Sequence, residues 1–273
     1  MAQQIKFFNK NNIDLDNTDA TITVTDATAT DTGQSIVDLM RNRNNTSGWL
    51  TTGSNDAANT TLVFDMIDEK QVSDIMVVKH NLKAFTIKYW NGLSYVDFST
   101  PINETTNTEE TNYYSFTEVS TTRIQLVITG TQVVNEDKII RQFIITNKLL
   151  TGQLTGWPLI RSPRHNTSKQ ISKMLSGKVN IVETTGAFSF SLEVRNWNID
   201  ADLNIIEEIY FGRKGVLISL SGGDDLQFSH RRIGYRKEDI YLVRAINDYS
   251  PEWVSGIYTN GLKIKMNLHE AIA

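Results

Sequence analysis

The side chains that could carry out chemistry are few and widely spaced along this chain. None of the 273 residues is a cysteine, which excludes disulfides, thiolate metal ligands and cysteine nucleophiles. No two histidines have the spacing of a metal site; they are His80, His165, His230 and His269. The chain also lacks the GxSxG pattern of serine hydrolases and the glycine-rich patterns of nucleotide-binding loops. We therefore predict no catalytic residues, no metal and no cofactor, and expect that the protein is not an enzyme.

Two acidic motifs suggest phosphate or metal binding, but turns explain both more simply. The run SGGDD at 221–225 is typical of a hairpin turn. Asp14, Asp16 and Asp19 resemble the start of a calcium loop, but the chain lacks the glycine and glutamate that such a loop needs at its sixth and twelfth positions. We expect Asx-turns there, and a structural Ca²⁺ is the less favoured alternative.

Aromatic rings near a predicted hairpin are the best candidates for binding, because a ring face can stack on a sugar. The candidates are Trp90, Tyr95, Tyr113 and Tyr114. They flank the polar segment 101–112, which has almost no apolar residue and is predicted to be an exposed loop. Strand alternation would bury about half of these rings. A glycan-binding surface and a set of core residues therefore remain alternatives.

The densest basic cluster is predicted to contact neighbouring subunits. It consists of Arg231, Arg232, Arg236 and Lys237. Acidic neighbours at 224–225 and 238–239 nearly cancel its charge, which favours salt bridges between subunits over contact with DNA in a channel.

Composition divides the chain into an acidic and a slightly basic part. Residues 1–150 carry 12 Lys and Arg against 18 Asp and Glu, and residues 151–273 carry 15 against 13. Neither part is basic enough to predict specific nucleic-acid binding. The N-terminus MAQQIKFFNKNN lacks the apolar segment of a signal peptide, and no apolar run approaches the length of a membrane span. We expect synthesis in a cytoplasm and no membrane span.

Short segments rich in β-branched and aromatic residues predict antiparallel strands through the first part of the chain. After a run at 20–30 and a helical turn at 35–40, the predicted strands are 61–66, 74–79, 84–89, 95–98, 113–116, 123–128 and 139–146. The dipeptide Asn91-Gly92 predicts a type I′ hairpin turn. The fold class is mainly β, with a sandwich at residues 1–146.

A second β unit is predicted at residues 179–273, after a structured connector at 147–178. VNIVET and AFSFSLEVRNW predict a strand pair around Gly186, and a helix is expected to start near Asp200 or Asp202. Four further segments predict strands, namely VLISL, LQFSH, IYLVRA and GLKIKMNLHEA, and the first two are predicted to form a hairpin around SGGDD. In the last of these, alternation should bury Leu262, Ile264, Met266 and Leu268.

The elements GWLTTG, FD and RIQLVITGT, in this order, resemble the discoidin-like (F5/8 type C, galactose-binding-like) jelly-roll sandwich over residues 20–146. The resemblance implies that Trp49 packs beneath the sandwich and that attachment, rather than catalysis, is its role. Glycan contacts are implied near Trp90, Tyr95, Tyr113 and Tyr114.

The β-β-α-β-β-β-β order of residues 179–273 resembles the tail-tube-like domain of phage distal tail and baseplate proteins. This resemblance implies a virion structural protein of a phage tail tip, made in the host cytoplasm. It also implies a homo-oligomeric ring, expected to be a hexamer, with the tail tube and hub proteins as partners. The alternative is a carbohydrate-binding module that attaches to host-surface glycans.

Overall fold

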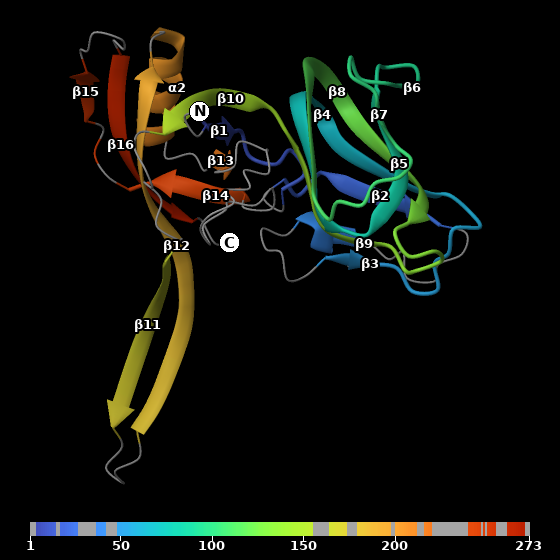
Figure 1. The fold of residues 1–273 in the computed structure, drawn as a ribbon, viewed down its shortest axis with the longest axis horizontal. Coiled ribbons are helices and arrows are strands. Elements are labelled where there is room, and N and C mark those ends of the chain that lie inside the picture. Colours follow the sequence, from blue (N-terminus) through green and yellow to red (C-terminus); the bar gives the residue numbers. More distant parts are fainter. Residues whose placement is uncertain are drawn as a thin grey trace. The chain divides into compact units, whose positions relative to one another are not determined.

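Two long strands, β4 (Thr60–His80) and β8 (Asn112–Thr131), organise the first half of the chain. The computed structural model describes residues 4–14, 17–26, 37–41, 48–154, 164–173, 179–197, 200–211, 216–219, 240–246, 248, 250–254 and 261–270. The chain forms two compact units. One takes Phe8–Leu149, and the other takes Met1–Phe7 together with most of the chain from Leu150 onward. Figure 1 labels the strands of each.

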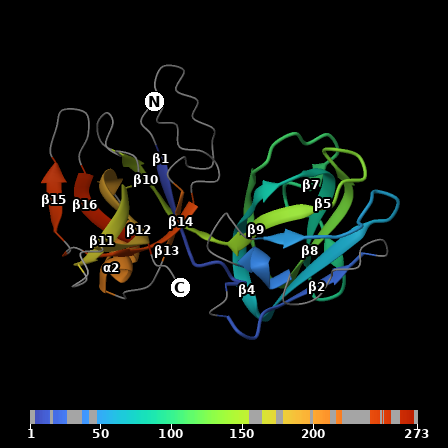
Figure 2. The ribbon, with the colours of Figure 1, turned by 90° about the horizontal axis from the view of Figure 1, so that it is seen from below.

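The unit Phe8–Leu149 is an antiparallel sandwich, as its alternating strands predict. Its other elements are β2 (Thr21–Thr25), the 3-10 helix η1 (Asp38–Arg41), β3 (Trp49–Leu50), β5 (Leu82–Trp90), β6 (Tyr95–Val96), β7 (Ile102–Glu104) and β9 (Ile139–Thr146). The strand order is β3-β9-β4-β8-β5-β6, with β2 also paired to β4 and β7 to β5. The strands are seen from a second direction in Figure 2.

β4 and β8 each run through both layers of this sandwich. The first part of β4 pairs with β2 and β8, whereas its last part, from Asp74, pairs with β9 and the start of β8. Register shifts between Asp65 and Lys70 and between Val72 and Asp74 mark bulges, which bend a strand and increase its twist. One continuous sheet thereby folds over onto itself.

The core lies between the two layers. Phe64 of β4 stacks on Phe143 of β9 with ring centroids 4.1 Å apart and planes 5° apart. Trp49 is completely buried in the same cluster, as the resemblance to discoidin-like sandwiches implies. Gly48 precedes it because a Cβ there would lie only 2.5 Å from the Cα of Arg141. The Gly-Trp pair thus combines a close backbone approach with a large buried ring.

The described parts of the other unit form a closed ring of strands and include the helix α2. Its elements are β1 (Gln4–Phe8), β10 (Lys148–Leu154), β11 (Arg164–Lys173), β12 (Val179–Trp197), α2 (Asp200–Phe211), β13 (Val216–Ser219), β14 (Ile240–Ala245), β15 (Pro251–Val254) and β16 (Gly261–Glu270). Neighbouring strands follow the order β12-β10-β1-β13-β14-β16, and β16 also pairs with β12, which closes the ring. Ile264, Met266 and Leu268 of β16 are buried, as predicted.

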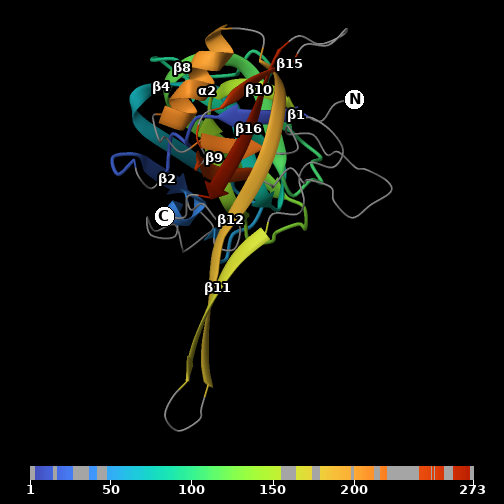
Figure 3. The same ribbon diagram turned by 90° about the vertical axis from the view of Figure 1, so that its left-hand side faces the viewer.

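A long two-stranded ribbon extends this ring. The first part of β12, Val179–Ser189, pairs with β11, while the part from Ser189 to Trp197 pairs with β16. Among the described residues no third strand joins Val179–Phe188, and Figure 3 shows the ribbon from the side. Among the strands that the structure describes, none pairs with the outer edge of β11 or of Val179–Phe188, and such edges can accept a further strand.

The mainly β class predicted from the sequence is confirmed, with three differences in detail. Four predicted strands merge into β4 and β8, because the polar residues between them remain paired through bulges. The strand pair predicted around Gly186 is one continuous strand, β12. Residues 4–7 belong with the C-terminal unit, and the predicted connector contributes the strands β10 and β11. No helix in the described parts is long and apolar enough to cross a membrane.

Candidate functional site

A row of five side chains crosses the outer face of one layer of the sandwich. Backbone pairing places Thr21 of β2 opposite Asp65 of β4, and Asp65 opposite Arg123 of β8. Trp90 of β5 is opposite Tyr95 of β6, and the pairing of β5 with β8 brings Trp90 beside Arg123. Residues 62, 64, 124 and 126, which alternate with the row, are buried in the core. We call Thr21, Asp65, Arg123, Trp90 and Tyr95 the Trp90 row.

The side chains of the Trp90 row contact one another. The rings of Trp90 and Tyr95 meet edge to face, with centroids 5.1 Å apart and planes at 63°. The guanidinium carbon of Arg123 lies 5.9 Å from the Trp90 ring centroid, within the range of a cation–π contact. Arg123 Nε donates a hydrogen bond of 2.6 Å to Asp65 Oδ2. The row therefore has a polar end and an aromatic end.

The charge states within the row follow from these contacts. The hydrogen bond and charge of Asp65 raise the pKa of Arg123, so the guanidinium stays protonated. Burial raises the pKa of Tyr95, and Asp65 adds to the effect while Arg123 opposes it. Tyr95 consequently presents a neutral hydroxyl at physiological pH.

A second row lies beside the first on the same face. It contains Thr23, Val63, Gln125, Lys88 and Asp97. Lys88 Nζ lies 3.5 Å from Asp97 Oδ1, and both side chains are at least one-third exposed. This pair and the Asp65–Arg123 pair account for all the charged side chains in the two rows.

The turn that joins β5 to β6 differs from the predicted type I′ turn. Since Trp90 pairs with Tyr95, the turn has four residues, and Gly92 alone among them has a positive φ, of 97°. Asn91 forms an Asx-turn instead: its Oδ1 accepts hydrogen bonds of 2.9 Å from the backbone N–H groups of Leu93 and Ser94. The hydrogen bonds to the side chain of Asn91 therefore stabilise this turn, which does not need the two left-handed residues of a type I′ turn.

A bulge with an unusual backbone conformation adjoins Asp65. Ile67 has φ 67°, which is rare for a β-branched residue, and its side chain is 54% exposed. Its N–H donates a 2.9 Å hydrogen bond to Asp65 Oδ1. Asp65 is thus fixed from two sides, by Ile67 and by Arg123.

Of the four aromatic residues predicted for binding, the structure brings together Trp90 and Tyr95 and places the other two elsewhere. Tyr113 donates a 2.5 Å hydrogen bond to the buried Asp74 and packs edge-on against Phe8. Tyr114 donates a 3.0 Å hydrogen bond to Glu104, and burial raises the pKa of its hydroxyl. Neither ring belongs to the Trp90 row.

The segment 101–112 forms a short strand and several buried hydrogen bonds that its polar sequence does not predict. Residues 102–104 form β7, and Asn107 and Thr111 are buried. Asn107 Nδ2 donates to the backbone oxygens of Leu82 and Glu109. The predicted exposed loop is therefore found in part: many of its residues are exposed, while amide side chains here satisfy backbone groups that strands would otherwise pair.

Two basic side chains occupy oxygen-lined positions in the sandwich. Arg41 donates to the backbone oxygens of Ile13, Asp14 and Asn17, which belong to the segment that resembles a calcium loop. The backbone N–H groups of Asn17 and Ala20 donate to the carbonyl oxygens of Asp14 and Asn17, which forms backbone turns there, and the Asx-turns stay a prediction. No group of three or more potential metal-ligating side chains occurs in the described parts of the chain.

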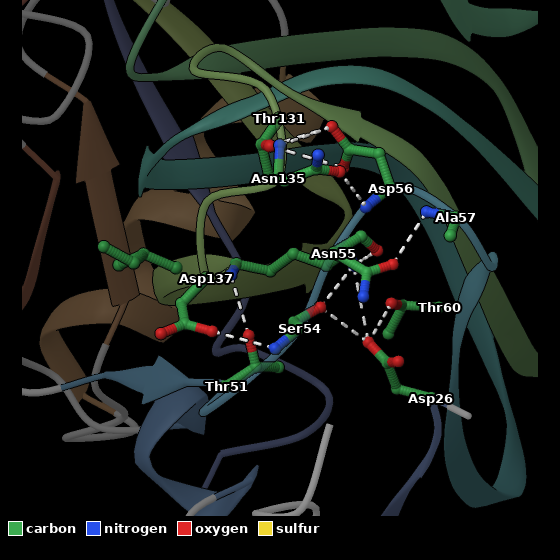
Figure 4. A network of polar contacts seen from close by, with 12 residues as sticks. Asp26, Thr51, Ser54, Asn55, Asp56, Ala57, Thr60, Thr131, Asn135 and Asp137 are labelled. Atoms are coloured by element: carbon green, nitrogen blue, oxygen red, sulfur yellow. Dashed lines mark hydrogen bonds and ion pairs between the residues drawn. The ribbon is translucent and has the colours of Figure 1, made fainter. Parts of the chain in front are cut away.

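The second basic side chain is Lys138, which forms a buried polar network with Asp26, Ser54 and Asn55, and Figure 4 labels these three partners. Its ammonium lies 3.4 Å from Asp26 Oδ2, donates to the backbone oxygen of Asn55 at 3.0 Å, and contacts the hydroxyl of Ser54. Thr60 also donates to Asp26. The side chains of Lys138 and Asp26 are completely buried, so this network stabilises the loops and offers no charged group to a ligand.

Sequence reasoning missed Asp65 and Arg123. A usable signal was present, because each directly precedes or follows a core residue in an alternating strand and must therefore point outward. The basic cluster Arg231, Arg232, Arg236 and Lys237 and the SGGDD motif lie outside the described residues.

No family model matches the chain, and no curated protein does. Among solved structures, it is similar to chitosan-binding module 1 from a chitosanase/glucanase of Paenibacillus sp. IK-5, with 12% identity, 51% of this chain and 99% of that chain covered, and a TM-score of 0.40. A Clostridium perfringens module crystallised with GalNAc-β-1,3-galactose matches at 10% identity, with 47% and 96% covered and a TM-score of 0.37. A Ruminococcus gnavus fucosidase matches at 13% identity and a TM-score of 0.38, over 50% of this chain and 26% of the fucosidase. At these scores the likeness says nothing of what this chain binds.

Proposed function

We propose that the protein is a non-catalytic binding protein whose sandwich attaches to glycans through the Trp90 row. The observation that carries the proposal is the half-buried aromatic pair of Trp90 and Tyr95 on the outer face of the sheet, set beside the hydrogen-bonding pair of Arg123 and Asp65. Sugars present apolar C–H faces and polar hydroxyl edges. The Trp90 row matches both kinds of surface within one line of side chains.

The strands fix the geometry of this surface in advance. Neighbouring strands are about 4.8 Å apart, so Asp65, Arg123, Trp90 and Tyr95 span roughly 14 Å. The Arg123–Asp65 hydrogen bond and the Arg123–Trp90 contact restrict the rotamers of these side chains before any ligand arrives. A surface ordered in this way loses less conformational entropy on binding.

A glycan array with the full chain tests the proposal. We expect binding by the wild type and losses of at least about tenfold in affinity for Trp90→Ala and Tyr95→Ala, the equivalent of about 1.4 kcal/mol. Thr86→Ala is the matched control, because Thr86 lies on the same face of β5, four residues before Trp90, and its variant should bind like the wild type. If no glycan binds, or if Trp90→Ala binds like the wild type, the proposal is wrong.

A second candidate function is assembly into a phage tail tip, and the β11–β12 ribbon favours it. A two-stranded ribbon is marginally stable alone in water, so a third strand from a neighbouring subunit would complete it. On this proposal the C-terminal unit forms a ring, expected to be a hexamer, at the end of the tail tube, and carries the sandwich as an attachment domain of the virion.

Light scattering coupled to size-exclusion chromatography tests the assembly function, with and without tail tube and hub proteins. A ring, alone or on one of these partners, is the expected result. A monomer that binds neither partner would eliminate this second candidate while leaving glycan binding untouched.

A further inference from the structure

We infer that the ligand of the Trp90 row is an electrically neutral sugar, held through two neighbouring hydroxyl groups by Arg123 and Asp65. This inference rests on the proposed glycan-binding function and specifies its ligand. Its basis is the balance of charge on the face and the hydrogen-bonding groups that remain available there.

The two rows on this face carry no net charge. Their four charged side chains form two pairs, Arg123 with Asp65 at 2.6 Å and Lys88 with Asp97 at 3.5 Å. The remaining positions of the two rows are threonine, valine, glutamine, tryptophan and tyrosine.

Charge balance acts against ionic ligands of either sign. A carboxylate placed near Arg123 would also lie near Asp65, and an ammonium placed near Asp65 would also lie near Arg123. The two interactions have opposite signs and similar strength at similar distances, so they largely cancel. A uronic acid or an amino sugar therefore gains little from its charge, and its dehydration still costs free energy.

The unused hydrogen-bonding capacity of the pair suits hydroxyl groups. A guanidinium has five N–H donors, and Arg123 uses its Nε–H on Asp65. Its two terminal nitrogens have no hydrogen-bond partner among the residues that the structure describes. Each oxygen of Asp65 accepts one described bond, from Arg123 or from Ile67, and retains a further lone pair.

Donor and acceptor thus lie side by side at the polar end of the row. A sugar hydroxyl both accepts and donates, so one of two adjacent hydroxyls accepts from a terminal nitrogen of Arg123 while its neighbour donates to Asp65. The aromatic end then receives the C–H face of the same or the next sugar ring. Both ends of the row contribute without any charge on the ligand.

Binding of the full chain to three immobilised polysaccharides tests the inference: neutral galactan, anionic polygalacturonate and cationic chitosan. Measurements run from about 0.01 M to about 1 M sodium chloride, which shortens the Debye length from about 30 Å to about 3 Å. We expect the tightest binding to galactan, with an affinity that changes less than about twofold across this range. Arg123→Gln and Asp65→Asn should each weaken it by about tenfold, as expected for loss of a hydrogen bond to a charged group.

The outcomes separate this inference from the function on which it rests. Tighter, salt-sensitive binding to polygalacturonate or chitosan that Trp90→Ala abolishes would overturn the neutral ligand and keep the glycan-binding site. Galactan binding lost in Trp90→Ala but unchanged in Arg123→Gln would overturn the role of the Arg123–Asp65 pair. No binding to any glycan on the array would reject the function itself. Melting temperatures of all variants, compared with that of Thr86→Ala, identify any that fail to fold.

Discussion

Replacing Lys138 by methionine should destabilise the sandwich more than any surface change of similar size. Lys138→Met keeps most of the side-chain volume but removes an ammonium that is completely buried against the equally buried Asp26. The carboxylate then remains in the core with hydrogen bonds from the hydroxyls of Ser54 and Thr60 (Figure 4) but without its cation. An unbalanced charge in a medium of low polarity is the reason for the expected loss.

The expected loss is about 3–5 kcal/mol, the usual cost of removing one partner of a buried pair. That is a large part of the roughly 5–15 kcal/mol by which domains are stable. The double variant Lys138→Met/Asp26→Asn removes both charges, so we expect it to lose about 1–3 kcal/mol less than the sum of the two single variants. The exposed pair of Lys70 and Asp68, 3.4 Å apart, supplies the control, and Lys70→Met should cost less than about 1 kcal/mol.

Hydrogen exchange of the full chain in increasing urea provides the assay, because mass spectrometry of peptides from β4 and β8 reports the sandwich separately from the other unit. A cost for Lys138→Met equal to that of Lys70→Met would refute the reasoning. So would a double variant whose cost equals the sum of its parts, since the two charges would then not be coupled.

Three further predictions concern the backbone and pH. Gly48→Ala should destabilise the sandwich by about 1–3 kcal/mol in thermal unfolding, because the new Cβ would meet backbone atoms of β9; an unchanged melting temperature would contradict the close approach. Ile67→Asn should stabilise it by about 1 kcal/mol, since asparagine tolerates φ 67° and the exposed isoleucine contributes little packing; a lower melting temperature would argue against strain. Burial lowers the pKa of His80 from 6.5 to about 4, although its hydrogen bond to Asn112 opposes the shift. The folded state therefore favours neutral His80, so this stability is complete above about pH 6.5 and falls by about 3 kcal/mol as the pH drops through about 4, a dependence that His80→Gln should lack in urea titrations.

The sequence predicts where strands occur better than it predicts which of them join into one longer strand. β9 begins and ends at the predicted residues, since its apolar run is bounded by polar residues. The continuity of β4 was missed because the segment around Asp68 and Lys70 has the composition of a turn, while the structure pairs it through a bulge. Composition alone does not distinguish the two, because a bulge and a turn favour similar residues.

Two of the five residues of the Trp90 row were predicted from the sequence, and the reason lies in sequence distance. Trp90 and Tyr95 lie close together in the sequence, on either side of a predicted hairpin turn, although a two-residue turn at Asn91-Gly92 would have paired Trp90 with Leu93. Asp65 and Arg123 are 58 residues apart in the chain, and their pairing depends on the register of β4 against β8. A single sequence shows which face of its strand each residue occupies but does not show that register.

The path of the chain through β1 and β10 has a consequence for biosynthesis and for engineering. These two strands are neighbours in one sheet, yet the whole sandwich is translated between them. At a translation rate of 5–20 residues per second, β10 is synthesised on the order of ten seconds after β1. The sandwich, which is translated between them, therefore has time to fold first as an independent domain. Because the sandwich begins after β1 and ends before β10, which are adjacent strands, a different domain with neighbouring termini should be able to replace it. A short hairpin loop should also be able to do so, and neither would alter the strand order of the receiving sheet. Replacement of this one inserted segment would then change the domain that the chain carries, while the strands that receive it stay the same.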